Sequence, residues 1–374
     1  MKFLHLADLH LGKRLNDFSF LEDQVRLLCQ VEEIARSERA DAVLIAGDVY
    51  QKASPQSEAM AAFDQFITRL KEMGLAVFVI SGNHDSAQRI SYFSSLLKSS
   101  GVYVSEAFDG HLQQVTLQDE HGELVVSLLP FLKPIQLRRF YPDEKIETYQ
   151  DAVQAVLRHS PVDTSKRNVL VCHQFITGAE ISDSEEKTVG GLDNIDAAVF
   201  SDFDYVALGH IHKPQQCTRE TLRYAGSLMK YSFSEVNQKK SVTVVEMEEK
   251  GKISIRTVPL APPHDMRLVE GLMDDVLAMP YSEDYVWVTL RDELPPPDAR
   301  VTVSTVFPNM MKFSVVNSKT KTDIDVLARE AMENKSPEEL FTDFYRLQNN
   351  DCPPGPRHME ILRSLRKELE GEIR

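Results

Sequence analysis

The chain opens on the stretch Lys2-Phe-Leu-His-Leu-Ala-Asp8-Leu-His10, a short apolar run that ends in an aspartate and a histidine two residues apart. This pattern returns four more times. Apolar runs at residues 42–46, 76–80, 169–172 and 205–208 end in Gly47-Asp48, Gly82-Asn83-His84-Asp85, His173 and Gly209-His210-Ile-His212. Runs this short and β-branched, bounded by Gly or Asp, predict strands buried on both faces of a sheet.

In such a sheet the ligand crevice lies just beyond the carboxyl ends of the strands. Five strands would therefore deliver Asp, His and Asn side chains to a single edge, where we expect a metal centre. Taken singly, each residue has a plainer interpretation as a core histidine, a helix cap or a turn asparagine. Their joint occurrence at five strand ends favours ligands. The other histidines are predicted to be non-ligands: His5, His111, His121, His159, His264 and His358.

Carboxylates, imidazoles and amide oxygens are the mixture of ligands that hydrolysis-competent ions such as Mn²⁺ accept. The predicted set fits two such ions: Asp8, His10, Asp48, Asn83, His173, His210 and His212. We predict Asp48 as the bridge between them, because it stands alone after its strand. Two ions roughly 3.5–4 Å apart clamp a phosphoryl group and activate a water. His84 is then available to stabilise phosphorane charge or to act as a general acid, and Asp85 could orient it.

The composition predicts a soluble globular protein. The chain has 374 residues, 42% of them hydrophobic, and no apolar stretch long enough for a transmembrane helix. The first strand begins almost at once, so we expect no signal peptide. The four cysteines have no metal-type or redox-type spacing, and we expect free thiols in a reducing cytoplasm. They are Cys29, Cys172, Cys217 and Cys352.

The formal net charge of −15 argues against a protein that simply coats DNA. Basic pairs occur at Lys13-Arg14, Arg138-Arg139 and Lys239-Lys240, and each alone is typical of a solvated surface. If the substrate is a nucleic acid, the electrostatic attraction must come from the metals, from local patches or from a partner.

The order of elements predicts an α/β fold, an α+β layered sandwich, with two appendages. Residues 1–262 alternate strands with helices at 22–36 and 58–71, and end in antiparallel strands at 222–225, 241–246 and 253–258. Residues 263–321 predict a small α+β cap, with strands at 286–290 and 312–316. Residues 322–374 predict C-terminal helices. The first begins at Ser336-Pro-Glu-Glu339, and the last carries Leu362, Leu365, Leu369 and Ile373.

The motifs resemble those of the calcineurin-like metallophosphoesterases, whose pattern is D-x-H, G-D, G-N-H-D/E, H and G-H-x-H. Gly47-Asp-Val-Tyr-Gln-Lys52 lacks the Asp-Arg-Gly continuation of the protein Ser/Thr phosphatases. Four further stretches resemble the double-strand-break repair nucleases of this superfamily. They are Leu6-Ala-Asp-Leu-His-Leu-Gly12, Ser182-Asp-Ser-Glu185, Tyr205-Val-Ala-Leu-Gly-His-Ile-His-Lys-Pro-Gln215 and Arg223-Tyr-Ala-Gly-Ser-Leu-Met-Lys-Tyr-Ser-Phe-Ser-Glu235.

The resemblance implies two Mn²⁺ per chain and a catalytic His84. One ion would be held by Asp8, His10, Asp48 and His212, and the other by Asp48, Asn83, His173 and His210. The resemblance also implies a homodimer that works with an ABC-type ATPase, with 3′-to-5′ exonuclease action on duplex ends and endonuclease action on hairpins or single strands. The cap would face DNA, and the C-terminal helices would dock on the ATPase.

One departure and two alternatives remain. Archaeal and eukaryotic relatives carry a second histidine shortly after G-D, where this chain has Gln51-Lys52, so that role is not transferred. A phosphodiesterase or phosphatase for small substrates is one alternative, disfavoured by the length of the chain. A non-catalytic scaffold that binds DNA ends is the other, disfavoured by the intact set of ligands.

Overall fold

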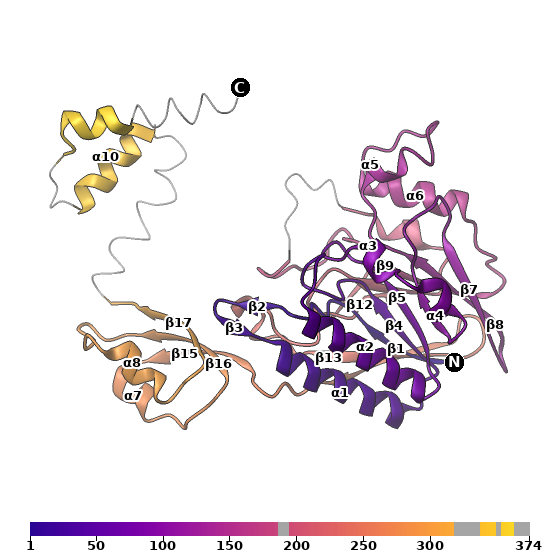
Figure 1. The fold of residues 1–374 in the computed structure, drawn as a ribbon, viewed down its shortest axis with the longest axis horizontal. Helices are drawn as coiled ribbons and strands as arrows, with labels where there is room; N and C mark the ends of the chain where they lie inside the picture. The colour runs from indigo at the N-terminus through magenta and orange to yellow at the C-terminus, as the bar shows by residue number, and fades with distance from the viewer. Residues whose placement is uncertain (186–193, 318–336, 349–352, 363–374) are drawn as a thin grey trace. The chain divides into compact units, whose positions relative to one another are not determined.

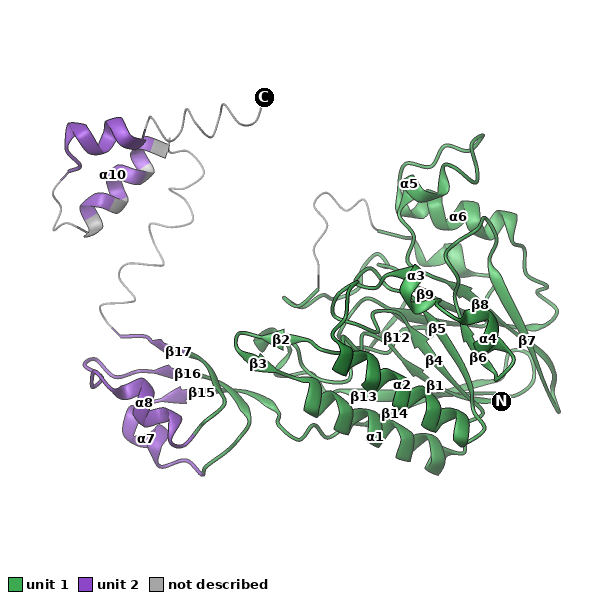
Figure 2. Cartoon of the chain, viewed as in Figure 1, with its two compact units in different colours: residues 1–268, 281–287, 307–312 green, residues 269–280, 288–306, 313–374 purple. Residues whose placement is uncertain are grey.

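The computed structural model describes residues 1–185, 194–317, 337–348 and 353–362 (Figure 1). The chain divides into two compact units (Figure 2). One comprises residues 1–268, 281–287 and 307–312, and the other comprises residues 269–280, 288–306 and 313–374.

The first unit contains two six-stranded sheets. In spatial order, the first sheet holds β14 (Ile253–Pro259), β13 (Ser241–Met247), β1 (Lys2–Leu6), β4 (Ala42–Ala46), β5 (Ala76–Ile80) and β6 (Val102–Val104). The second holds β11 (Gln215–Cys217), β12 (Arg219–Tyr224), β10 (Tyr205–Gly209), β9 (Arg167–His173), β8 (Gly122–Leu129) and β7 (Gln113–Asp119). The predicted layered sandwich is confirmed, and the pair β13–β14 is antiparallel as expected. Strand β12 pairs antiparallel with β11, which was not predicted, and parallel with β10.

The prediction of a single sheet behind the five clusters is wrong. Strands β1, β4 and β5 belong to the first sheet, whereas β9 and β10 belong to the second. One hydrophobic core lies between the sheets and includes Phe3, Leu44, Phe78, Val171 and Tyr205. Because helices cover the outer faces, strands of both sheets are buried on both sides. Apolar runs of this kind carry no alternation that would tell which sheet they join.

Helices α1 (Leu21–Glu38) and α2 (Ser57–Glu72) lie against the first sheet and against each other (Figure 1). In α1 the buried side chains Leu27, Val31 and Ala35 recur every four residues, which aligns them on one face. Helix α6 (Tyr149–His159) begins at the capping threonine Thr148 and buries its apolar face in the core of the second sheet.

The shorter elements of the first unit connect these layers. They are β2 (Arg14–Leu15), β3 (Phe18–Ser19), α3 (Ala87–Ile90), α4 (Ser94–Lys98), α5 (Pro134–Leu137), and two 3₁₀ turns at Ala197–Phe200 and Phe233–Glu235. The hairpin β2–β3 follows directly on the ligand stretch that ends at His10.

The region after residue 262 contains a three-stranded sheet in the order β15 (Met266–Gly271), β16 (Tyr285–Leu290) and β17 (Met310–Val315). Strands β16 and β17 were predicted, whereas β15 was missed. Helix α7 (Met273–Leu277) lies between β15 and β16 in the sequence, and α8 (Ala299–Ser304) lies between β16 and β17. Helix α10 (Pro337–Gln348) follows β17, and residues 356–362 are helical. Ser336, Cys352, Leu365, Leu369 and Ile373 lie outside the described residues.

Among the described residues, none of the helices is long and apolar enough to cross a membrane. Cys29, Cys172 and Cys217 are free thiols, as predicted.

His5 is a buried core residue rather than a ligand, as the sequence predicted. Its Nδ1 faces the Tyr205 hydroxyl at 2.9 Å and its Nε2 faces the Leu208 carbonyl at 3.1 Å, so the ring links a strand of one sheet to a strand of the other. Burial lowers the pKa of His5 from 6.5 to about 3.

This depressed pKa predicts a loss of stability in acid. Between pH 6.5 and about 3 the unfolded chain holds a proton on His5 that the folded chain does not, so stability falls as the pH falls, by about 1.4 kcal/mol per pH unit. The His5→Gln variant keeps a donor for Leu208 but does not titrate. The unfolding free energy of both proteins is measured with urea at pH 7 and pH 5, with chelator present. From pH 7 to pH 5 it should fall by about 2 kcal/mol more in the wild type than in His5→Gln. Equal losses of unfolding free energy in the two proteins would contradict a depressed pKa for His5.

Candidate metal centre

All eight side chains predicted from the sequence come together where the two sheets meet. Asp8 and His10 follow β1, Asp48 follows β4, and Asn83 and His84 follow β5. From the second sheet, His173 ends β9, while His210 and His212 follow β10. Backbone hydrogen bonds join the loop after β1 to the loop after β4. The amide of Asp8 donates to the carbonyl of Gly47 at 3.1 Å, and the amide of His10 donates to the carbonyl of Asp48 at 2.9 Å.

The backbone is strained at the ligands themselves. Asp8, His10 and Asp48 have φ values of 52°, 43° and 50°, which lie in the left-handed region that residues other than glycine rarely adopt. Each such residue costs on the order of 1–3 kcal/mol and persists where surrounding structure enforces it. His210, another predicted ligand, has a φ of 104°. Strain at four polar residues of one centre is typical of a functional site.

One group of donors surrounds His10. Its Nε2 lies 3.0 Å from Nε2 of His212 and 3.6 Å from Oδ2 of Asp48. Donor atoms of Asp8, His10 and His212 all lie within 4.8 Å of one another. Ligands at right angles around an ion, each at about 2.1 Å, lie about 3 Å apart. The two facing nitrogens therefore have the separation of neighbouring ligands on one cation.

The second group surrounds His173. Its Nε2 lies 3.0 Å from Oδ1 of Asn83 and 3.4 Å from Oδ2 of Asp48. Nδ1 of His210 approaches the same Asn83 oxygen at 3.1 Å. Nδ1 of His173 donates to the Ala46 carbonyl at 2.8 Å, which directs Nε2 at Asp48 and Asn83 and makes Nε2 the nitrogen that would bind a cation once its proton is lost. Oxygen Oδ2 of Asp48 is thus shared between the two groups.

His84 lies beside the first group. Its Nε2 is 4.0 Å from Oδ2 of Asp48, its ring meets that of His10 edge-on at 4.9 Å, and its Nδ1 faces the Gln51 carbonyl at 3.2 Å. His10, Asp48 and His84 also bring donor atoms within 4.8 Å of one another. His84 keeps 18% of its side chain exposed, against 1% for His10, so it is the member of this trio that solvent reaches.

The donor set fits divalent cations. Asp8 and Asp48 are 0% and 2% exposed, and their ion-pair partners within the described residues are histidines. Two buried carboxylates this close are costly without a positive charge between them. Carboxylate, imidazole and amide donors together suit hydrolysis-competent divalent metals.

The electrostatics leave several rings ready to bind a cation. Burial lowers the pKa of His10 well below its ordinary value and that of His210 to about 3, so both are neutral at pH 7. Burial raises the pKa of Asp8 to about 6. Burial opposes charge on Asp48 and His173 too, but their mutual attraction outweighs it. The pKa of Asp48 falls below its usual range, and that of His173 rises to about 9. A cation that binds must displace the His173 proton.

Glycines allow the loops to approach one another closely. A Cβ on Gly82 would overlap the carboxylate of Asp48, and a Cβ on Gly209 would overlap the carbonyl oxygen of Ala46. Gly209 belongs to the second sheet and Ala46 to the first, so this contact sets how closely the two halves of the centre meet.

Asp85 does not fill the role suggested for it. Its carboxylate accepts hydrogen bonds from the amides of Val49 at 3.1 Å, Tyr50 at 3.0 Å and Gly82 at 2.9 Å. These hydrogen bonds join the Asp48 loop to the Asn83 loop rather than reaching the His84 ring. The sequence assigned no role to four polar residues that lie behind His212: Ser184, Glu185, Glu235 and Lys240. The interpretation of Lys239-Lys240 as a solvated surface is wrong for Lys240, which is buried.

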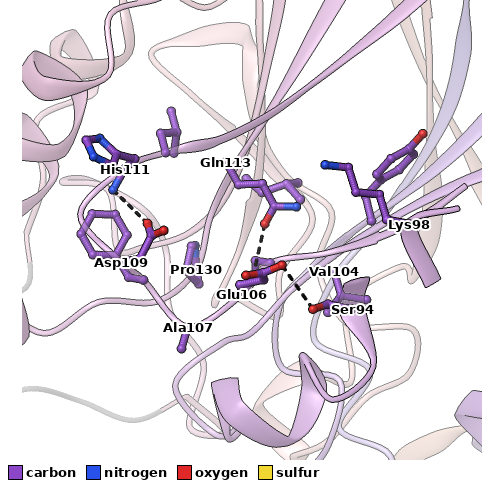
Figure 3. A pocket seen from close by; sticks show the side chains of 14 residues that line it. Ser94, Lys98, Val104, Glu106, Ala107, Asp109, His111, Gln113 and Pro130 are labelled. Carbon is purple, nitrogen blue, oxygen red and sulfur yellow. Dashed lines mark hydrogen bonds between the residues drawn. The ribbon is translucent and has the colours of Figure 1, made fainter. Parts of the chain in front are cut away.

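A cavity of about 220 Å³ lies elsewhere in the first unit, lined by residues that include Ser94, Lys98, Glu106, His111 and Gln113 (Figure 3). None of the eight predicted residues lines it. Its mixed lining, which includes two acids, one amide, one histidine and one lysine, suggests no particular ligand.

Similarity to known proteins extends over most of the chain. Residues 1–214 match the family described as calcineurin-like phosphoesterase, and residues 262–349 match the type 5 capsule protein repressor C-terminal domain. The SbcD subunit of the nuclease SbcCD from Staphylococcus epidermidis is 33% identical over 324 residues, covering 84% of this chain and 86% of that protein. Its namesake from Staphylococcus saprophyticus is 33% identical over 319 residues, covering 83% and 84%.

Among solved structures, the match to a dimetal phosphatase from Danio rerio spans 69% of this chain and 95% of the phosphatase chain. The two chains are 11% identical, and the TM-score is 0.40.

The shared oxygen of Asp48 leads to a test of the centre. Asp48→Ala should abolish high-affinity binding of both ions, because this carboxylate lies against nitrogens of both groups. His10→Ala should weaken mainly one site. Calorimetric titration of each variant with Mn²⁺, with folding checked by circular dichroism, measures both. An Asp48→Ala protein that binds two Mn²⁺ as tightly as wild type would exclude a shared carboxylate.

Proposed function

This chain belongs to the calcineurin-like phosphoesterase family, and from that membership we propose that it is the Mn²⁺-dependent DNA nuclease subunit of an ATP-dependent complex. It would act as a 3′-to-5′ exonuclease on duplex ends and as an endonuclease on hairpins and single strands. The observation that carries the proposal is the convergence of seven ligand-type side chains from two sheets, in a chain related to nuclease subunits over most of its length.

Two divalent ions, when bound, would supply Lewis-acid chemistry that polarises a phosphodiester and lowers the pKa of water. Asp8, His10, Asp48 and His212 would hold one ion, and Asp48, Asn83, His173 and His210 the other. The close contacts within each group support this division. Asp48 would hold the two sites at a fixed separation, because one oxygen faces both.

His84 is proposed as the catalytic histidine. Its Nδ1 faces the Gln51 carbonyl, which favours a proton on Nδ1 and leaves Nε2 on the side of Asp48. A ring protonated on both nitrogens could donate from Nε2 to a departing oxygen, and its partial exposure leaves room for substrate. It would act on charge that develops in the transition state rather than serve as a ligand.

An acidic chain must concentrate positive charge locally to bind DNA. Lys13 directs its ammonium toward the ring of Tyr231, at 5.0 Å from the centroid, and Tyr231 in turn packs against His10 and His212. A lysine this close to the centre supports binding of a phosphate backbone there.

The chain regions receive proposed roles. Residues 1–262 would form the nuclease domain, residues 263–321 a DNA-facing cap, and residues 322–374 the helices that dock on an SbcC-type ABC ATPase. The match of residues 262–349 to a separate family description supports a distinct role for this region. The free thiols fit a cytoplasmic location.

A homodimer is proposed from an exposed apolar surface in the first unit. Tyr92, Phe93 and Leu96, at the start of α4 and just before it, are 69%, 59% and 67% exposed. Clustered apolar side chains of this size are typical of a protein interface. A second copy of the chain is the partner that we propose for this surface.

Two alternatives are decided by one experiment. Purified protein is incubated with blunt duplex, hairpin and single-stranded DNA, with Mn²⁺ or chelator, with and without the ATPase. Cleavage of a small phosphodiester but of no DNA would favour a small-substrate phosphodiesterase or phosphatase. Binding of ends without Mn²⁺-dependent cleavage would favour a non-catalytic scaffold.

His84→Ala tests the assignment of the catalytic histidine. It should keep both ions, because the other donors remain, but lose nuclease rate by roughly 10²–10⁴-fold, as for removal of one acid–base group. Metal analysis of the purified variant and single-turnover cleavage of a hairpin provide the two measurements. A missing ion would identify His84 as a ligand.

Truncation after Asp325 tests the role of the C-terminal helices. The shortened protein should stay folded, bind Mn²⁺ and cleave a simple phosphodiester, since the centre lies wholly in residues 8–212. It should lose ATP-stimulated cutting of duplex ends and co-purification with the ATPase. By light scattering it should remain a dimer, because residues 92–96 are retained. A truncated protein that still binds the ATPase would exclude docking through these helices.

A further inference from the structure

Two motifs noted in the sequence have no part in the donor set. They are Ser182-Asp-Ser-Glu185 and the stretch that ends at Glu235. Both lie behind His212. Glu235 is 0% exposed and Lys240 is 5% exposed, so these charges are held inside the protein. Buried charged groups are costly unless they are fully hydrogen-bonded, which makes their arrangement informative.

The ring of His212 is held from its far side. Its Nε2 faces His10, while its Nδ1 lies 2.6 Å from the hydroxyl of Ser184. The same hydroxyl makes a short hydrogen bond to Oε1 of Glu235. A carboxylate only accepts, so Ser184 donates to Glu235 and must accept from the ring. The ring proton is therefore on Nδ1, and the Nε2 lone pair points into the centre.

The main chain of His212 is fixed by the same set of residues. Its amide donates to Oε1 of Glu185 at 2.8 Å, and its carbonyl accepts from Nζ of Lys240 at 2.8 Å. Lys240 also donates to Oε2 of Glu235 at 2.6 Å. One buried ion pair thus secures both the side chain, through Ser184, and the backbone of a single histidine.

The neighbouring donor has no comparable support. Nδ1 of His10 is buried without a hydrogen-bond partner among the described residues. Of the two imidazoles that face each other in this group, His212 is the anchored one. Fixing the ring orientation and tautomer of a metal-binding histidine through its other nitrogen strengthens its binding to the metal.

We propose that Ser184, backed by Glu235 and Lys240, is a positioning residue that holds His212 as its Nδ1–H tautomer and so sets the cation affinity of the site formed by Asp8, His10, Asp48 and His212. This inference rests on the proposed function, because it assumes that the site binds a divalent ion. Loss of such a supporting hydrogen bond lowers metal affinity by roughly 10- to 100-fold. The site of Asn83, His173 and His210 should be unaffected.

The experiment compares Ser184→Ala with Ser184→Thr, which restores a hydroxyl, and with Ser127→Ala. Ser127 is a buried serine of β8 that contacts Gln114, so its loss controls for removal of a buried hydroxyl. Each full-length protein is titrated calorimetrically with Mn²⁺. Nitrogen-15 NMR of histidine-labelled, metal-free protein reports the tautomer of His212, which is assigned by comparison with His212→Gln.

Ser184→Ala should weaken one of two Mn²⁺ sites by roughly 10- to 100-fold and give mixed tautomers at His212. Ser184→Thr and Ser127→Ala should behave as wild type. Unchanged Mn²⁺ affinity in a folded Ser184→Ala protein would overturn the proposal, as would an Nε2–H tautomer in the wild type. The wild-type tautomer decides the case if the variant fails to fold. A wild type that binds no Mn²⁺ would refute the proposed function instead, and leaves the tautomer prediction standing.

Discussion

The centre depends on one contact between the two sheets. The carbonyl oxygen of Ala46, at the end of β4, accepts a hydrogen bond from His173 of β9 and packs against Gly209 of β10. There is no room for a side chain at that point. This contact brings together the ends of β4, β9 and β10, where Asp48, His173 and His210 lie. The spacing of these three residues therefore follows from the packing of the backbone, and a densely packed core allows little adjustment.

The surrounding charges follow from that spacing. Asp8 and Asp48 are buried beside His173, whose ring carries a positive charge, and the pKa values of Asp48 and His173 shift in opposite directions as a result. The folded protein without metal thus keeps a proton where a cation would lie. Binding of a cation and release of a proton are linked in such a centre, and the ligand loops need no large movement to accept the ion.

Much of this could be predicted from the sequence. The five strands lie within two residues of their predicted limits, and the eight polar side chains after them meet, because strand ends and ligand chemistry are local signals. The partition into two sheets was not predictable, since runs buried on both faces look alike in either sheet. The roles of Asp85 and Ser184 were also missed. Ser184 forms hydrogen bonds with His212 and Glu235, which are 28 and 51 residues away in the sequence. Asp85 accepts from the amides of Val49 and Tyr50, which are 36 and 35 residues away. No rule of sequence spacing predicts contacts over such separations.

The placement of β1 has a consequence for biosynthesis. This first strand lies between β4 and β13, and its Lys2 pairs with Glu246, while His10 meets His212 across 202 residues of sequence. During synthesis β1 emerges long before β13, so one of its edges stays open until residue 247 has left the exit tunnel. Over that interval the nascent chain carries an apolar strand with an open edge, which is exposed to aggregation.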